Sequence, residues 1–167
     1  MTYYIAQSFG IIAMFLSAIM PLPKKKWKML AICFFVNIFV ILNYLLLDGI
    51  TSGVVLNTIG NIQIIVSLIH IKTNTKATTI ENIVFFIAYV ACGLFSYAGP
   101  IDLIHIVAVI FFMLAVFAKD MKTTRFLNIG NALSWIIYSL LVGATAFLSP
   151  TLALVSNIVG LVKDRKD

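Results

Sequence analysis

Long apolar runs separated by short polar or charged segments dominate the chain. Seven of these runs are long enough to form predicted helices, which we place near residues 3–20, 28–47, 52–70, 80–97, 101–118, 124–142 and 150–163. A helix needs roughly 17 to 25 mostly apolar residues to cross the hydrocarbon core of a bilayer. The pattern therefore predicts an all-α membrane protein with seven transmembrane helices.

Residues that start or stop helices mark the ends of these runs. Pro21 follows the first run, and the pair Ser149-Pro150 is predicted to cap the seventh helix. Thr78 and Glu81 have the spacing of a capping box, in which each residue satisfies a backbone N–H of the other at a helix start. This box is expected at the start of the fourth helix.

Composition supports the membrane interpretation. The 167 residues are 62% hydrophobic and only 11% charged, which is more apolar material than a soluble domain of this length can bury. The two cysteines, Cys33 and Cys92, lie in apolar runs without CxxC spacing, so we interpret them as small buried hydrophobes. The net charge of +6 comes from short clusters between the runs, so we expect a lipid bilayer and no nucleic acid as partner.

The basic residues predict the orientation of the chain. All twelve Lys and Arg fall between the first and second, third and fourth, or fifth and sixth predicted helices, or after the seventh. Seven alternating spans bring these four segments to the same side of the membrane. Because Lys and Arg in short loops stay on the cytoplasmic side, the amino terminus is expected outside and the carboxy terminus in the cytoplasm.

Two pairs of predicted helices match each other in sequence. A shift of 94 residues lays the second helix over the sixth and pairs Asn37 with Asn131. A shift of 100 residues lays the third helix over the seventh and pairs Asn57 with Asn157, each followed three positions later by a glycine. Asparagine is rare in apolar helices, so these matches indicate an internal repeat.

The repeat predicts a 3+1+3 arrangement. Residues 1–76 and 100–167 would form two parallel three-helix bundles, and residues 77–99 would supply a linker transmembrane helix. Because three is an odd number, the linker helix is needed for the second bundle to enter the membrane in the same direction as the first. Parallel repeats of this kind are known among sugar-transporting membrane proteins.

This layout resembles the SWEET and PQ-loop superfamily of transporters. More closely, the segment AQSFGIIAMFLSA, the lysine cluster after it and the segment NYLLLDGITSGVVLNTIGNIQ resemble the YgjV-type inner-membrane proteins of bacteria. The resemblance covers nearly the whole chain and is strongest over residues 6–66. It implies a protein of the bacterial cytoplasmic membrane and, through the superfamily, a carrier of a small solute such as a sugar. The Pro-Gln pair that names the PQ-loop group does not occur in this sequence.

The resemblance also implies a set of solute-binding residues. Asn57 and Asn157 would face a central cavity and bind solute hydroxyls, since a carboxamide offers two donors and an acceptor without a charge. Trp135, four residues after Asn131 on one helical face, would supply an aromatic wall. Asn37 and Asn131 complete the candidate set. For all five residues the alternative is a structural role in helix packing.

Other chemistry has weaker support in the sequence. Asp102 and His105, three residues apart near the outer end of the fifth predicted helix, could form a proton-coupling pair, or could simply lie at the membrane boundary. The sequence contains no HExxH, GxSxG or phosphate-loop motif, and its acidic residues lie at or beyond the helix ends. We therefore expect no enzymatic activity, no metal and no cofactor.

Two functions remain open at this level. The first is a uniporter-like carrier that exposes a site for a small neutral polar solute alternately to the two sides of the membrane. The alternative is a non-transporting interaction or assembly protein whose asparagines only hold helices together. The oligomeric state is also open, with a homo-oligomer among the alternatives.

Overall fold

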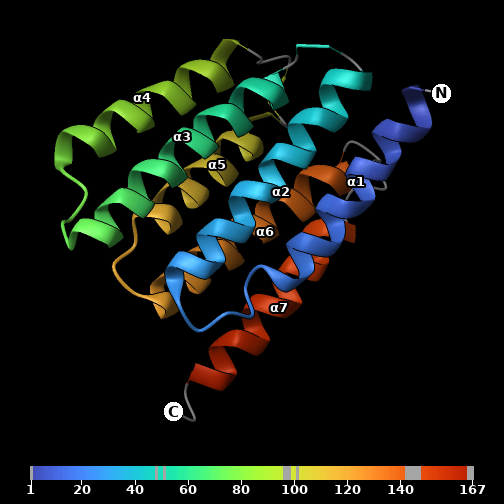
Figure 1. Ribbon diagram of the computed structural model, residues 1–167. Coiled ribbons are helices and arrows are strands. Elements are labelled where there is room, and N and C mark those ends of the chain that lie inside the picture. The colour runs from blue at the N-terminus through green and yellow to red at the C-terminus, as the bar shows by residue number, and fades with distance from the viewer. Residues whose placement is uncertain are drawn as a thin grey trace.

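The structure, a computed structural model, describes residues 2–47, 49–50, 52–95, 99–100, 102–141 and 148–164. Over these residues it is all-α (Figure 1). The helices are α1 (Thr2–Ile19), α2 (Lys26–Leu47), α3 (Ser52–Thr73), α4 (Thr79–Phe95), α5 (Asp102–Phe117), α6 (Met121–Leu141) and α7 (Leu148–Asp164). The seven predicted helices are confirmed, with ends that differ from the prediction by at most three residues.

The helix starts show both a confirmed and a corrected prediction. Thr78 and Glu81 form the predicted capping box, with the Thr78 N–H donating to Glu81 Oε2 at 2.6 Å and the Glu81 N–H donating to Thr78 Oγ1 at 3.2 Å. Ser149 and Pro150, predicted to cap α7, lie instead inside its first turn, because the helix begins at Leu148. Proline is tolerated there because the backbone N–H that it lacks has no partner in a first turn.

Large apolar side chains cover the outside of the molecule. Two helices, over Lys26–Leu47 and Gly53–Thr73, are long and apolar enough to cross a membrane, and shorter apolar helices cover Tyr3–Ile19, Thr79–Phe95, Ile106–Phe117 and Ser149–Lys163. Phe15 is 65% exposed and Phe95 is 94% exposed. An apolar exterior of this extent matches a hydrocarbon solvent rather than water.

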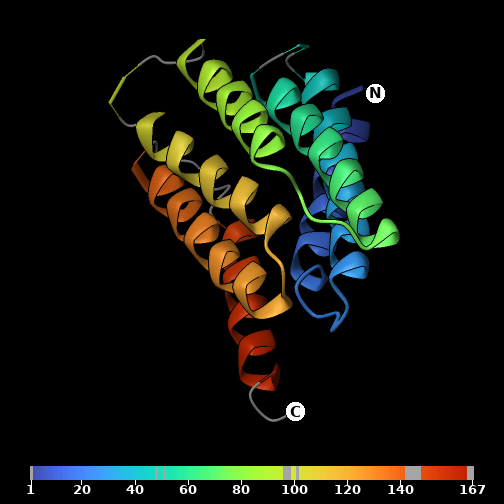
Figure 2. The ribbon, with the colours of Figure 1, turned by 90° about the vertical axis from the view of Figure 1, so that its left-hand side faces the viewer.

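Six helices form a closed ring in the order α1, α2, α3, α5, α6, α7, with α7 packed against α1. Helix α4 lies outside this ring and packs against α3 and α5. Helices that follow each other in sequence run in opposite directions, so the two termini lie at opposite ends of the bundle (Figures 1 and 2). We call α1–α3 the first triplet and α5–α7 the second triplet.

The described basic residues lie at one end of the bundle, which we call the basic end. This end contains the α1–α2, α3–α4 and α5–α6 connections and the end of α7 (Figure 1). Its residues are Lys24, Lys25, Lys26, Lys28, Lys72, Lys76, Lys119, Lys122, Arg125 and Lys163. The predicted gathering of positive charge at a single end is thus present in the fold.

Candidate functional site

The interior of the bundle contains a set of polar side chains. Nine polar or charged side chains among the described residues are buried: Asn37, Asn61, Gln63, Ser67, Thr124, Arg125, Asn128, Ser134 and Asn157. Hydrocarbon offers no hydrogen bonds, so polar side chains of a membrane protein turn inward to find partners or a ligand. This buried polar set is the candidate site.

Asn57 and Asn157 occupy matching positions on helices that lie across the ring from each other. Each donates from Nδ2 to the carbonyl four residues earlier, Asn57 to Gly53 O at 2.7 Å and Asn157 to Ala153 O at 2.8 Å. Asn57 is half-buried, whereas Asn157 has no exposed surface. The buried Oδ1 of Asn157 accepts no hydrogen bond from the described residues.

Asn37 and Asn131 lie at contacts inside the two triplets. Asn131 donates from Nδ2 to Ala108 O at 2.7 Å and so joins α6 to α5. Asn37 is buried where α2 meets α3, and its Nδ2 would lie 3.2 Å from a Cβ added at Gly60. These contacts are what the helix-packing alternative expects.

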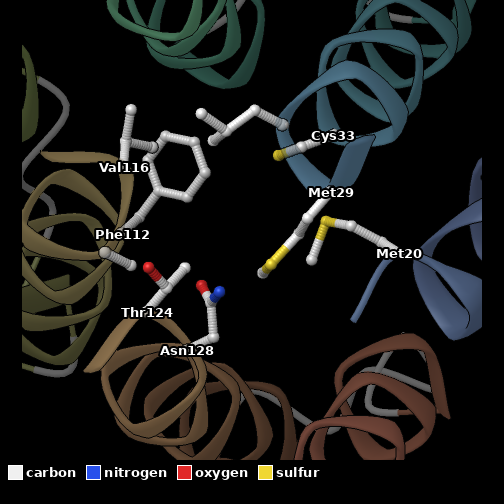
Figure 3. A pocket seen from close by; sticks show the side chains of 9 residues that line it. Met20, Met29, Cys33, Phe112, Val116, Thr124 and Asn128 are labelled. Atoms are coloured by element: carbon white, nitrogen blue, oxygen red, sulfur yellow. The ribbon is translucent and has the colours of Figure 1, made fainter. Parts of the chain in front are cut away.

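A small cavity lies between α1, α2, α5 and α6, in the half of the bundle toward the basic end (Figure 3). Its volume is about 10 Å³, which is room for a single water molecule. Its lining residues are Met20, Met29, Leu30, Cys33, Phe112, Ala115, Val116, Thr124 and Asn128. The structure therefore brings none of the five predicted binding residues to this cavity.

The polar lining of the cavity comes from two residues that sequence reasoning missed, Thr124 and Asn128. They fall on the α6 face that also carries Asn131 and Trp135, at spacings of four, three and four residues. This spacing is the signal that could have found them. Trp135 is half-buried, and its ring meets the Tyr138 ring edge-on at a centroid distance of 5.8 Å.

Gln63 is a second residue whose position the sequence did not predict. It is fully buried and donates from Nε2 to Met113 O at 2.9 Å, and its Oε1 accepts the Tyr89 hydroxyl at 2.9 Å. This chain of bonds ties α3 to α5 and α4. A glutamine in the middle of an apolar helix is itself a signal for such a contact.

Arg125, which the sequence groups with the basic residues between the fifth and sixth helices, lies well inside α6. Asp120 accepts the Thr123 N–H at 2.8 Å and caps α6, so the helix begins at Met121 and Arg125 lies one turn inside it. The Arg125 side chain is only 1% exposed. It donates to Pro21 O at 3.2 Å, Gly160 O at 2.8 Å and Pro23 O at 3.0 Å. The fork of a guanidinium suits several acceptors at once.

The two proton-coupling candidates lie at the start of α5. Asp102 is the first residue of α5 and His105 lies in its first turn, but their side chains fall outside the described part of the structure. His70, in the last turn of α3, contacts Glu81 of α4 through Nε2 at 3.1 Å. The proton-coupling interpretation of Asp102 and His105 therefore stays a prediction.

Comparison with known proteins adds one match. The family model Imp-YgjV, described as a bacterial inner membrane protein, matches residues 4–167. No curated protein and no solved structure matches the chain.

Proposed function

The chain belongs to the Imp-YgjV family of bacterial inner membrane proteins, and from this premise we propose that it carries a small neutral polar solute, such as a sugar, across that membrane. The observation that carries the proposal is the buried amide oxygen of Asn157, which has no hydrogen-bond partner among the described residues. An unpartnered buried acceptor costs about 1–3 kcal/mol. A solute hydroxyl that donates to this oxygen would recover that free energy.

The order of the helices in the ring supports two equivalent triplets. The triplets meet where α3 packs against α5 and where α7 packs against α1. If α1 corresponds to α5 and α3 to α7, these two contacts are equivalent. This is the contact pattern that a parallel 3+1+3 repeat requires, with α4 as the linker outside the ring. It also favours the relation to the SWEET and PQ-loop superfamily. The Lys and Arg residues at the basic end support a cytoplasmic location for that end.

The size of the cavity supports a closed state of such a carrier. A volume of about 10 Å³ admits no sugar. In the proposed mechanism the two triplets rock about their junctions and open a solute path alternately to each side. Asn57 and Asn157 bind solute hydroxyls, Trp135 packs on the solute, and Thr124 and Asn128 continue the path toward the basic end. No catalytic step, metal or cofactor takes part.

A non-transporting membrane protein is the second candidate. The hydrogen bond from Asn131 to Ala108 O favours it, as does the bond from Asn43 Nδ2 to Ala6 O at 2.7 Å, because both amides join neighbouring helices. On this alternative the buried amides only stabilise the bundle.

Uptake into proteoliposomes distinguishes the two candidates. The probes are radiolabelled glucose, glycerol and other neutral polyols, and the variants are Asn157→Ala and Asn57→Ala. The matched control is Asn82→Ala, since Asn82 Nδ2 makes the same bond to a carbonyl four residues earlier, Thr78 O at 3.0 Å, but lies on α4 outside the ring. The carrier proposal expects uptake by wild type and Asn82→Ala, and a loss of about five- to tenfold in Asn157→Ala, the effect of one or two lost hydrogen bonds.

Equal uptake in all variants would remove the binding role of these amides. The non-transporting alternative instead expects no uptake of any probe, melting temperatures that no probe shifts, and a lower melting temperature for Asn131→Ala. A pH gradient that leaves the uptake unchanged would exclude proton coupling through Asp102 and His105.

A further inference from the structure

Two basic side chains connect the triplets at the basic end, and they do so reciprocally. Arg125 extends from the start of α6 to the chain that follows α1, and Lys26 extends from the start of α2 to the chain that follows α5. Helices α2 and α6 are the counterparts of each other in the two triplets, as are α1 and α5. The same type of contact is therefore made in both directions.

The Arg125 contact fixes three segments at once. Its Nε and Nη2 donate to Pro21 O and Pro23 O, two and four residues beyond the end of α1, while Nη1 donates to Gly160 O of α7. Both carbonyls follow the carboxy-terminal end of α1, where the helix dipole places partial negative charge. A buried guanidinium bound to them holds the end of α1 against α6.

The Lys26 contact is the counterpart in the other direction. Its Nζ donates to Ala118 O, the carbonyl directly after the end of α5. Here too a cation lies at the carboxy-terminal end of a helix from the other triplet, where the helix dipole favours it. Other described bonds between the triplets lie in the same half of the bundle, from Ser67 Oγ to Val116 O at 2.9 Å and from Ser156 Oγ to Ala18 O at 2.6 Å.

Both contacts adjoin the wall of the cavity. Met20 and Thr124 line it and directly precede Pro21 and Arg125, and Met29 lines it one turn after Lys26 (Figure 3). Moving either basic side chain away from its carbonyls would release the segments that separate the cavity from the basic end.

We propose that Arg125 and Lys26 form a two-part gate that closes the basic end of the solute path. The inference rests on the proposed function, because a gate needs a path to close. Opening toward the basic end breaks the bonds of Arg125 to Pro21 and Pro23 and the bond of Lys26 to Ala118. The end of α1 then moves away from α6, and the end of α5 moves away from α2.

The chain contains its own reporter for this gate. Cys33 lines the cavity and is only 6% exposed, while the other cysteine, Cys92, lies on α4 away from the cavity. In a Cys92→Ala background, a water-soluble maleimide reacts with Cys33 only when the cavity opens. The protein is reconstituted in lipid nanodiscs, so that both ends are accessible to the reagent.

The variants are Lys26→Met, which keeps the apolar stem and removes the donor, and Arg125→Lys, which keeps the charge and loses the fork. The matched control is Lys28→Met, because Lys28 lies two residues from Lys26 but extends over the Trp27 ring at 5.5 Å. If the gate exists, Cys33 should be labelled at least about tenfold faster in Lys26→Met and Arg125→Lys than in the Cys92→Ala background. Tenfold corresponds to a shift of about 1.4 kcal/mol in the opening equilibrium. Lys28→Met should label at the background rate.

Equal labelling rates in Lys26→Met and the background would overturn the gate. Lys26→Met keeps the test decisive if Arg125→Lys does not fold, which size-exclusion chromatography would show. Labelling needs no solute, so its outcome is independent of the uptake assay. Faster labelling without uptake of any probe would show that the two side chains close the cavity but would reject their role in solute transport, whereas uptake with unchanged labelling would reject the gate alone.

Discussion

The first and second triplets carry the same motif in different surroundings. In α3 and α7 an asparagine is followed three residues later by a glycine, and both asparagines bond to their own helix. Yet a Cβ at Gly60 would meet Asn37 and Phe112, each at 3.2 Å, whereas a Cβ at Gly160 would meet Arg125 Nε at 2.6 Å. A repeated sequence does not guarantee a repeated environment, because the neighbours of each copy come from parts of the chain that differ.

Helix α4 causes part of this difference. It packs on α3, whereas α7 packs on α6 and α1 within the described part of the chain. Gln63 of α3 is fully buried because Tyr89 of α4 and the Met113 carbonyl of α5 satisfy its amide. The position that the shift of 100 residues pairs with it in α7 is Lys163, an exposed residue at the basic end. Matching positions of α3 and α7 are therefore buried and hydrogen-bonded in one triplet and exposed in the other.

Alanine at the two glycines is the strongest test of this comparison. Gly160→Ala should lower the free energy of unfolding by about 3 kcal/mol, because the new methyl displaces a buried guanidinium from its carbonyls. Gly60→Ala should change it by about 1 kcal/mol or less, since contacts of 3.2 Å need only small shifts and alanine favours the helix. Thermal unfolding in detergent measures both, and equal effects would mean that the two environments do not differ energetically.

The polar contact between α4 and Gln63 should give an intermediate effect. Gln63→Leu leaves the Tyr89 hydroxyl and the Met113 carbonyl without their partner and should cost about 2 kcal/mol, and Tyr89→Phe about 1 kcal/mol. In the double variant the two effects should not add, because they share one hydrogen bond. Tyr4→Phe, at a 76% exposed position, serves as the control. Strict additivity would contradict the contact.

The cap of α6 should give the smallest effect, and one that depends on pH. Hydrogen bonds from the Thr123 N–H and hydroxyl lower the pKa of Asp120 below its ordinary value. The ionised carboxylate therefore stabilises the fold above about pH 4, and this contribution disappears as the pH falls through the lowered pKa. The residue directly before α2 is Lys25, so α2 has no capping carboxylate at the position that Asp120 holds before α6.

The substitution Asp120→Asn tests this pH dependence, since it keeps a capping oxygen but removes the charge. We expect it to lower the free energy of unfolding by about 0.5 kcal/mol at pH 7. The difference from wild type should vanish near pH 2. Thermal unfolding without denaturant, measured between pH 2 and pH 7, gives this difference in the free energy of unfolding. A difference that is constant with pH would show that the charge of Asp120 contributes nothing.

Much of the fold was predictable because its signals are local. The seven apolar runs and the capping box of Thr78 and Glu81 depend on residues within a few turns of each other. The sequence placed the start of α6 at residue 124, but the helix begins at Met121. The cap at Asp120 adds a first turn that is basic and polar and contains Lys122. A helix can therefore begin before its apolar run begins.

The candidate site was predictable only in part. The sequence singled out Asn157 because a repeated asparagine in an apolar run is unusual, and the structure buries it completely. Arg125 donates to the carbonyl of Pro21, 104 residues away in the sequence, and Gln63 donates to the carbonyl of Met113, 50 residues away. The local sequence could not predict either acceptor. The carrier and gate assignments remain proposals that the uptake and labelling assays test.

By itself the sequence determined the number of helices, their approximate ends and the gathering of basic residues at one end, because hydropathy, capping and loop charge act over short stretches of chain. Only the tertiary structure decided the ring order, the placement of α4 outside the ring and the burial of Arg125. Apolar faces pack against one another or against lipid with little directional preference, so which helices meet depends on a few polar contacts and close approaches between distant residues.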